Sequence, residues 1–96
     1  MSAVEYLPEN AELRTQYHFF RDHKRCTGIT WLVQPGDPIT EGQVLGHFTF
    51  ATEKPVEIVA PVDAMVAQTY TPNLTELAAR PSVAIALFLP KPAPTA

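Results

Sequence analysis

Proline and glycine interrupt this chain so often that it has no room for a long helix. Ten prolines and four glycines are spread through its 96 residues, and a proline inside a helix removes a backbone donor and clashes with the preceding turn. The segments between these breaks alternate apolar and polar residues, which is the pattern of strands with one buried face. The sequence therefore predicts an all-β fold, a small flattened barrel or sandwich of two antiparallel sheets.

The length of the chain limits it to one domain with one core. We expect residues 1–10 to form a loose N-terminal arm, because residues 8–10 continue no pattern. Residues 11–89 carry the alternating segments and form the domain. Residues 90–96 are a proline/alanine-rich tail, which is expected to stay semi-extended and not to pack.

Alternation predicts strands over residues 28–33, 44–50, 56–60 and 82–89, the last of them buried on both faces. Proline and glycine predict a tight turn over residues 35–38, and residues 23–25 are expected to form another turn. Over residues 12–21 the threonine and aromatic content favours a strand, with a short amphipathic helix from Ala11 as the alternative. Residues 73–80 predict one or two helical turns, ended by Pro81.

Aromatic residues on separate predicted strands indicate a shared interior. We expect the core to include Trp31, Phe48, Phe50 and Phe88, since aromatic rings that alternate with polar neighbours are typical of a sandwich core. The pair at residues 19–20, F-F, breaks the alternation. One of these two rings should therefore be exposed, or be covered by the N-terminal arm.

The strongest local prediction is a β-hairpin over residues 42–61. Its two arms carry apolar residues on one parity, and the short middle reads A-T-E-K at residues 51–54. The chain should therefore reverse around Thr52 and hold Lys54 near the tip of the hairpin, in solvent.

Charge and composition exclude several classes of partner. The formal net charge is -3 at pH 7, whereas sequence-independent binding of nucleic acid or acidic lipid needs a basic face. No apolar run reaches the length of a membrane span, and the N-terminus lacks the charged-then-apolar pattern of a signal peptide. The single cysteine, Cys26, fits a reducing compartment. We expect a cytoplasmic protein with no nucleic-acid or membrane partner.

The side chains that could bind a soft metal ion are His18, His23, Cys26 and His47. The H-x-x-C spacing at residues 23–26 could supply half of a zinc site, but no second pair follows. No third group orients a cysteine–histidine pair for nucleophilic catalysis. We therefore expect no metal centre and no enzymatic activity.

Two segments resemble the biotinyl/lipoyl carrier domain family. Residues 31–45, W-L-V-Q-P-G-D-P-I-T-E-G-Q-V-L, look like the family segment in which an apolar strand precedes G-D and then G-Q with a leucine two places on. Residues 56–62, V-E-I-V-A-P-V, resemble the segment that follows the family's modified lysine. Between them, T-E-K-P at residues 52–55 looks like the lipoyl signature T-D-K-A, and not like the biotin signature, in which methionines flank the lysine.

The resemblance implies a flattened barrel of two small antiparallel sheets with pseudo-twofold symmetry. It implies that Lys54 is a covalent attachment site, flanked by the signature residues Thr52 and Glu53, for lipoate in preference to biotin. Such a domain is a carrier, because a long acyl arm on an exposed tight turn reaches several active sites while the domain stays rigid. The implied partners are a lipoate- or biotin-attaching enzyme and a host multi-enzyme complex.

The chain departs from the family pattern around the lysine. The interval between Lys54 and Glu57 is one residue shorter than in the family, and Pro55 stands in place of alanine. If the A-P pair at residues 60–61 fixes the register, Glu53 takes the family's lysine position, and a shift of one residue turns a strand side chain to the opposite face. The second G-D turn implied by the pseudo-symmetry is also absent. These departures favour an alternative function, a lipoyl-like domain without acylation that acts as a structural or protein-interaction module.

Overall fold

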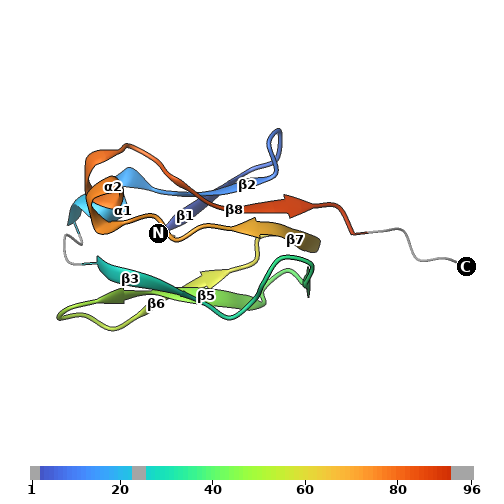
Figure 1. Cartoon of the computed structure of the whole chain (residues 1–96), viewed down its shortest axis with the longest axis horizontal. Helices are drawn as coiled ribbons and strands as arrows, with labels where there is room; N and C mark the ends of the chain where they lie inside the picture. The colour runs from blue at the N-terminus through green and yellow to red at the C-terminus, as the bar shows by residue number, and fades with distance from the viewer. Residues whose placement is uncertain (1–2, 23–25, 92–96) are drawn as a thin grey trace, which may run out of the picture.

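Two antiparallel sheets stack face to face in the computed structural model, which describes residues 3–22 and 26–91 (Figure 1). The larger sheet has five strands in the order β1-β2-β8-β7-β4, and the smaller has three in the order β3-β5-β6. The strands of the larger sheet are β1 (Val4–Leu7), β2 (Glu12–Thr15), β8 (Ala84–Leu89), β7 (Ala64–Thr69) and β4 (Pro38–Ile39). Those of the smaller sheet are β3 (Cys26–Trp31), β5 (Val44–Phe50) and β6 (Val56–Val59). The predicted all-β sandwich is confirmed, but the two sheets do not join into a closed barrel.

The core lies between the two sheets and is filled by large side chains from both. Its largest fully buried members are Phe48, Leu13, Ile39, Leu45, Ile58, Ile85 and Val66. Phe48, Phe50 and Phe88 are buried as predicted, and half-buried Trp31 packs against the core while its indole N–H donates to the carbonyl oxygen of Tyr70 at 3.0 Å. The closing strand β8 lies inside the larger sheet, and its consecutive residues Ile85 and Ala86 are both buried, which fits burial on both faces at its centre.

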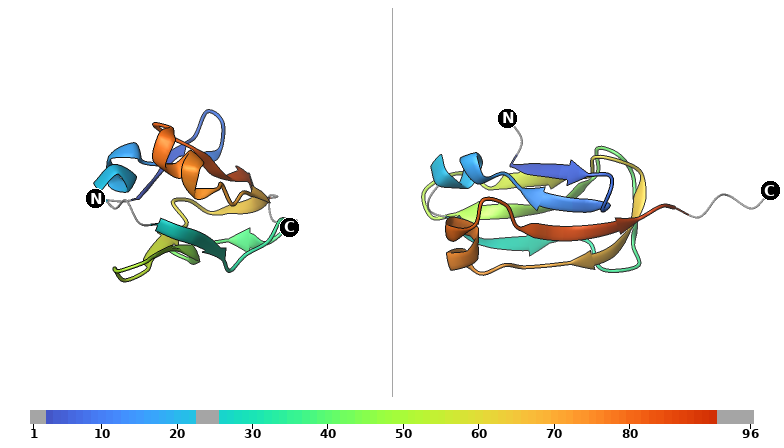
Figure 2. Two further views of the ribbon diagram at one scale, coloured as in Figure 1. Left: turned by 60° about the vertical axis from the view of Figure 1, so that its left-hand side comes forward. Right: turned by 90° about the horizontal axis from the view of Figure 1, so that it is seen from above.

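Two helices of six residues each lie at one end of the sandwich, α1 (Tyr17–Asp22) and α2 (Leu74–Ala79) (Figure 2). The predicted helix over residues 73–80 is confirmed by α2. Asn73 caps it, because its side-chain oxygen accepts from the N–H of Glu76 at 2.8 Å. The helix ends at Ala79, and its C-cap Arg80 has an extended backbone and precedes Pro81. No helix in the described part of the chain is long and apolar enough to cross a membrane.

The N-terminal segment differs from the prediction of a loose arm. Residues 4–7 form strand β1, which pairs antiparallel with β2 from Val4↔Thr15 to Leu7↔Glu12. Tyr6 packs its ring against Phe88, with centroids 5.9 Å apart. The prediction is wrong there because burial of Val4 and Tyr6 against the core outweighs the weak pattern of a four-residue segment.

The strand predicted over residues 12–21 stops at Thr15, and residues 17–22 form helix α1. The alternative, a helix from Ala11, is wrong in its start, because residues 12–15 are extended. A helix brings two consecutive aromatic rings onto the core at the end of the sandwich. Phe20 is buried and stacks edge-on against Phe48 at 4.9 Å, while half-buried Phe19 contacts Phe50 at 6.1 Å. The expectation that one of the pair is exposed or lies under an arm is therefore wrong. The predicted turn at residues 23–25 and most of the tail lie outside the described residues.

The predicted turn over residues 35–38 is present, and Gly36 makes it possible. The N–H of Asp37 donates to the carbonyl oxygen of Gln34 at 3.1 Å, and Gly36 has a φ of 97°, which a residue with a side chain rarely adopts. The Asp37 carboxylate accepts from the N–H of Gln34 at 3.0 Å and ties the turn together.

Gly46 of β5 is paired with Trp31 of β3, and the backbone of β3 leaves no room for a side chain at this position. A Cβ atom on Gly46 would overlap the carbonyl oxygen of Thr30 and lie 3.1 Å from the Cα of Trp31. The pairing of these two strands therefore requires a residue without a side chain at position 46.

The pseudo-twofold symmetry implied by the resemblance is incomplete. The order β3-β5-β6 in the smaller sheet parallels the order β7-β8-β2 in the larger one. In this correspondence β3 matches β7. Because β7 pairs with β4 on its other side, complete symmetry would require a further strand paired with β3. Helix α2 contacts β3 instead, in the region where the second G-D turn is absent.

Prolines accompany three of the four outermost strands, β1, β4 and β6. Pro8 follows β1, Pro38 begins β4, and Pro55 and Pro61 bracket β6. Ala60 exchanges both of its backbone hydrogen bonds with the β5 side of the hairpin, so the backbone nitrogen of residue 61 points away from the sheet. A proline there removes a donor that would otherwise face outward.

Candidate functional site

The candidate attachment lysine lies in the loop that closes the β5–β6 hairpin. The last pair before the loop joins Phe48 to Val56, so the register centres the reversal on Thr52 and the predicted hairpin is confirmed. Residues 51–55 are all exposed. In Figure 1 this loop extends beyond the end of the smaller sheet.

The loop is supported at its base by aromatic packing. Strand β5 continues two residues past its last pair with β6, and Phe50 there pairs with Cys26 of β3. The rings of Phe48 and Phe50 stack edge-on against Phe20 and Phe19 of α1, a favourable arrangement for aromatic pairs. The exposed loop therefore rises from a packed base that includes both β3 and α1.

Lys54 has the accessibility that acylation of its amine requires. Its side chain is exposed, and its ammonium group makes no ion pair within the described residues. Pro55 favours an extended backbone at Lys54, and Ala11 is the only described residue other than glycine with a positive φ. Lys54 thus lies in an exposed, irregular part of the loop, and a partner enzyme could reach its amine without displacing a neighbour.

Thr52 and Glu53 lie in the same exposed loop, so the structure brings the three signature residues together. The loop has five residues, whereas the resemblance implied a tight turn. Lys54 precedes the first residue of β6 by two positions and has not entered the strand. Glu53 lies one position closer to the centre of the reversal, as expected if the A-P pair fixes the register.

The other reactive side chains considered in the sequence are dispersed. Cys26 is buried at the start of β3, and its Sγ donates to the carbonyl oxygen of Gly28 at 3.6 Å. Burial raises the pKa of the Cys26 thiol, which disfavours the reactive thiolate. His18 is on α1, His47 is on β5, and His23 lies outside the described residues. In residues 3–22 and 26–91 there is no group of three or more histidine, cysteine or acidic side chains that could hold a metal ion.

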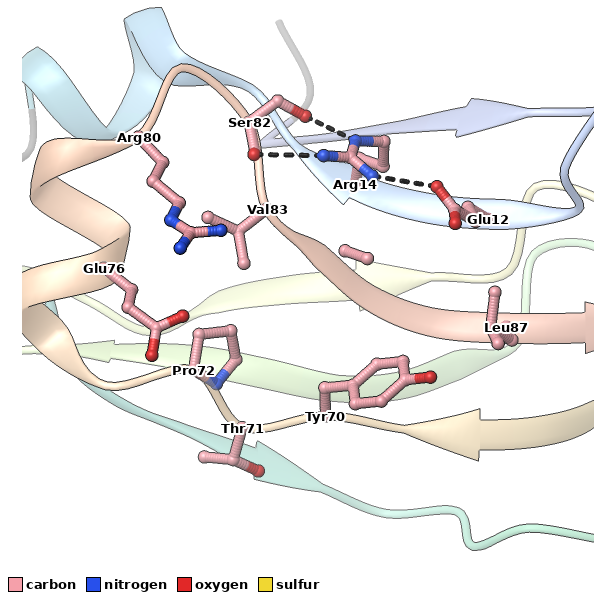
Figure 3. Close-up of a pocket in the computed structure, with 11 residues that line it drawn as sticks. Glu12, Arg14, Tyr70, Thr71, Pro72, Glu76, Arg80, Ser82, Val83 and Leu87 are labelled. Atoms are coloured by element: carbon pink, nitrogen blue, oxygen red, sulfur yellow. Dashed lines mark hydrogen bonds and ion pairs between the residues drawn. The ribbon is translucent and has the colours of Figure 1, made fainter.

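A groove beside β2 and β8 was not predicted from the sequence (Figure 3). It has a volume of about 440 Å³. We call it the Arg80 groove, and its principal lining residues are Arg14, Tyr70, Pro72, Glu76, Arg80 and Leu87. They come from three separate segments of the chain, so no local motif could have revealed the groove.

No protein-family model, no curated protein and no solved structure matches this chain in comparisons with known proteins.

Proposed function

We propose that the chain is a carrier domain of the biotinyl/lipoyl type and that Lys54 carries lipoate through an amide bond. The observation that supports this proposal is an exposed lysine in the loop of a hairpin whose base is packed into a two-sheet sandwich. The lysine motif T-E-K-P and its flanking segments favour lipoate over biotin. The domain itself catalyses no reaction.

The chemistry divides between the domain and its partners. An attaching enzyme supplies lipoate with an activated carboxyl group, and the neutral amine of Lys54 displaces the activating group to form the amide. Amide formation removes the lysine charge. The arm then takes up an intermediate at one enzyme of a multi-enzyme complex and gives it up at another, and the packed base keeps the domain rigid during this transfer. The expected cytoplasmic location belongs to this proposal.

Intact-mass measurement of the protein from its own host tests the proposal. We expect a mass increase of one lipoyl group, lost in Lys54→Arg and retained in Lys91→Arg, a matched change at an exposed lysine outside the hairpin. Arginine keeps the positive charge but cannot form the amide under these conditions. Detection of only the bare polypeptide, in cells whose other carriers are fully lipoylated, would contradict the proposal.

A second candidate function is a non-acylated lipoyl-like domain that acts as a structural or protein-interaction module. Two observations favour it: a five-residue loop with Pro55 in place of a tight turn, and the incomplete symmetry, in which no described strand pairs with the outer side of β3. Under this function, a host strain carrying Lys54→Arg keeps the normal phenotype of the protein. Loss of the phenotype in Lys54→Arg, but not in Lys91→Arg, would exclude the module and support the carrier.

A further inference from the structure

The Arg80 groove contains a positive and a negative side chain that do not pair with each other. Arg80 and Glu76 both line it, and neither forms an ion pair within the described residues. Residues four apart in a helix often pair, but Arg80 is the C-cap of α2, with an extended backbone at φ -101° and ψ 143°. The side chain of Arg80 therefore does not follow the regular spacing of the helix that would bring it next to Glu76. Figure 3 shows both groups at the same end of the groove.

The carboxylate of Glu76 is held in place by the N-terminal cap of α2. Its Oε1 accepts from the side-chain amide of Asn73 at 3.2 Å, while Asn73 accepts from the backbone N–H of Glu76 at 2.8 Å. This reciprocal arrangement differs from a capping box in one contact, because the Glu76 carboxylate accepts from the side-chain amide of the N-cap residue and not from its backbone N–H. It engages Oε1 of the carboxylate and leaves Oε2 without a hydrogen bond in the described part of the chain.

The charge of Arg14, on the β2 side of the groove, is already compensated. Its NH1 donates to Glu12 Oε2 at 2.8 Å, and its Nε and NH2 donate to the hydroxyl and carbonyl oxygens of Ser82 at 2.8 and 3.1 Å. Both Glu12 and Arg14 alternate with the buried Leu13, so they project from the sheet face away from the core. The two uncompensated charges in the groove are thus those of Arg80 and Glu76.

The remaining lining combines the apolar or aromatic residues Tyr70, Pro72, Val83, Ala84 and Leu87 with the hydroxyl-bearing residues Thr71 and Ser82. Val83 and Leu87 lie along one side, and Pro72 and the ring of Tyr70 lie opposite (Figure 3). A ligand that fits this lining needs an apolar body and, at one end, an anionic and a cationic group close together. A simple carboxylate would be repelled by Glu76, and a simple amine would be repelled by Arg80.

We propose that the Arg80 groove binds a free α-amino acid with an apolar or aromatic side chain, in its zwitterionic form. The guanidinium of Arg80 binds the carboxylate with paired N–H donors, and Glu76 accepts from the ammonium group. The side chain of the ligand lies against Val83 and Leu87. The site is separate from the β5–β6 loop and does not depend on the carrier function of Lys54.

Titration of the full chain with L-phenylalanine, followed by amide chemical shifts, tests this inference. We expect saturable shifts at Ala84 and Leu87 with a dissociation constant of roughly millimolar size, as suits a small ligand in an open groove. Because each lacks one of the two charges, 3-phenylpropionate and phenethylamine should bind about fivefold more weakly or worse.

Variants of the two charged residues identify the site. Arg80→Gln and Glu76→Gln should each weaken phenylalanine binding about fivefold, and the amide oxygen of glutamine at position 76 can still accept from the side-chain amide of Asn73. Lys91→Gln and Glu57→Gln make the same charge changes at exposed positions outside the groove and should leave binding unchanged. Unaltered amide shifts away from the groove verify that each variant is folded.

Three results would overturn the inference: the absence of saturation by phenylalanine, equal binding of 3-phenylpropionate, or equal weakening by the control variants. The first would mean that the groove has no ligand of this class. The second would assign it to simple carboxylates, and the third would reduce the effect to net charge.

Discussion

Replacing Gly46 with alanine is expected to destabilise the domain strongly, because the added methyl group would overlap the backbone of β3. The Cβ atom would collide with the carbonyl oxygen of Thr30 and approach the Cα of Trp31 at 3.1 Å. A backbone carbonyl cannot rotate away as a flexible side chain can, so β3 and β5 would have to separate. These are two of the three strands of the smaller sheet.

The cost follows from the usual range for overpacking, about 1–3 kcal/mol, and the rigid neighbour puts Gly46→Ala near the upper limit of about 3 kcal/mol. A domain of this size has a total stability of about 5–14 kcal/mol and a melting temperature that changes by about 4–8 °C per kcal/mol. The variant should therefore melt about 12–24 °C lower. Gly28→Ala is the matched control on the partner strand, since its Cβ would meet only Thr49 Oγ1 at 3.6 Å.

Urea unfolding followed by circular dichroism measures both variants. The midpoint for Gly46→Ala should fall with little change in the m-value, while Gly28→Ala should stay within about 1 kcal/mol of the parent and could gain stability through the less flexible unfolded chain. If the two variants lose equal stability, or if Gly46→Ala loses less than about 1 kcal/mol, the close approach of the two strands is not as described.

Three further predictions concern single side chains and are checked by urea unfolding. The hydroxyl of buried Thr15 accepts from the backbone N–H of Val83 at 3.0 Å, so Thr15→Val should cost about 1–3 kcal/mol, and Thr15→Ser, which keeps the acceptor, should cost less. Asn73→Ala removes the cap of α2 and should cost about 1 kcal/mol, with Asn73→Asp as the control that retains an acceptor. Burial raises the pKa of the Cys26 thiol in the folded state, so the free energy of unfolding should decline as pH rises above the thiol's ordinary value of about 8.5; Cys26→Ala should remove this decline, and an unchanged pH profile would contradict it.

Much of the fold could be predicted because the period of a strand is short and unambiguous. Strand β5 was predicted with its observed limits. Its alternating pattern allows only one assignment of side chains to the two faces, because a shift by one residue would turn Phe48 out of the core. The limits of α2 followed from Asn73 and Pro81, which have specific roles at helix ends. The exposure of Lys54 followed from the short polar segment between two apolar arms.

The failures arose where tertiary contacts outweighed local preference. Residues 17–22 have the aromatic content of a strand, yet they form α1 because a helix lets both Phe19 and Phe20 reach the core. The loop between β5 and β6 is longer than a tight turn because β5 runs two residues beyond its last pair with β6. In this extension Phe50 pairs with Cys26 of β3. The Arg80 groove depends on contacts such as that between Arg14 and Ser82, which are 68 residues apart.

The prolines beside the outer strands have a consequence for how copies of this domain behave together. An open strand edge is a template on which another chain can add, and such addition leads to aggregates or fibrils. Pro61, beyond β6, and Pro38, at the start of β4, lack the backbone N–H that an incoming strand would need as a hydrogen-bond donor. The same residues that break the chain into short strands thus also limit strand exchange between neighbouring molecules.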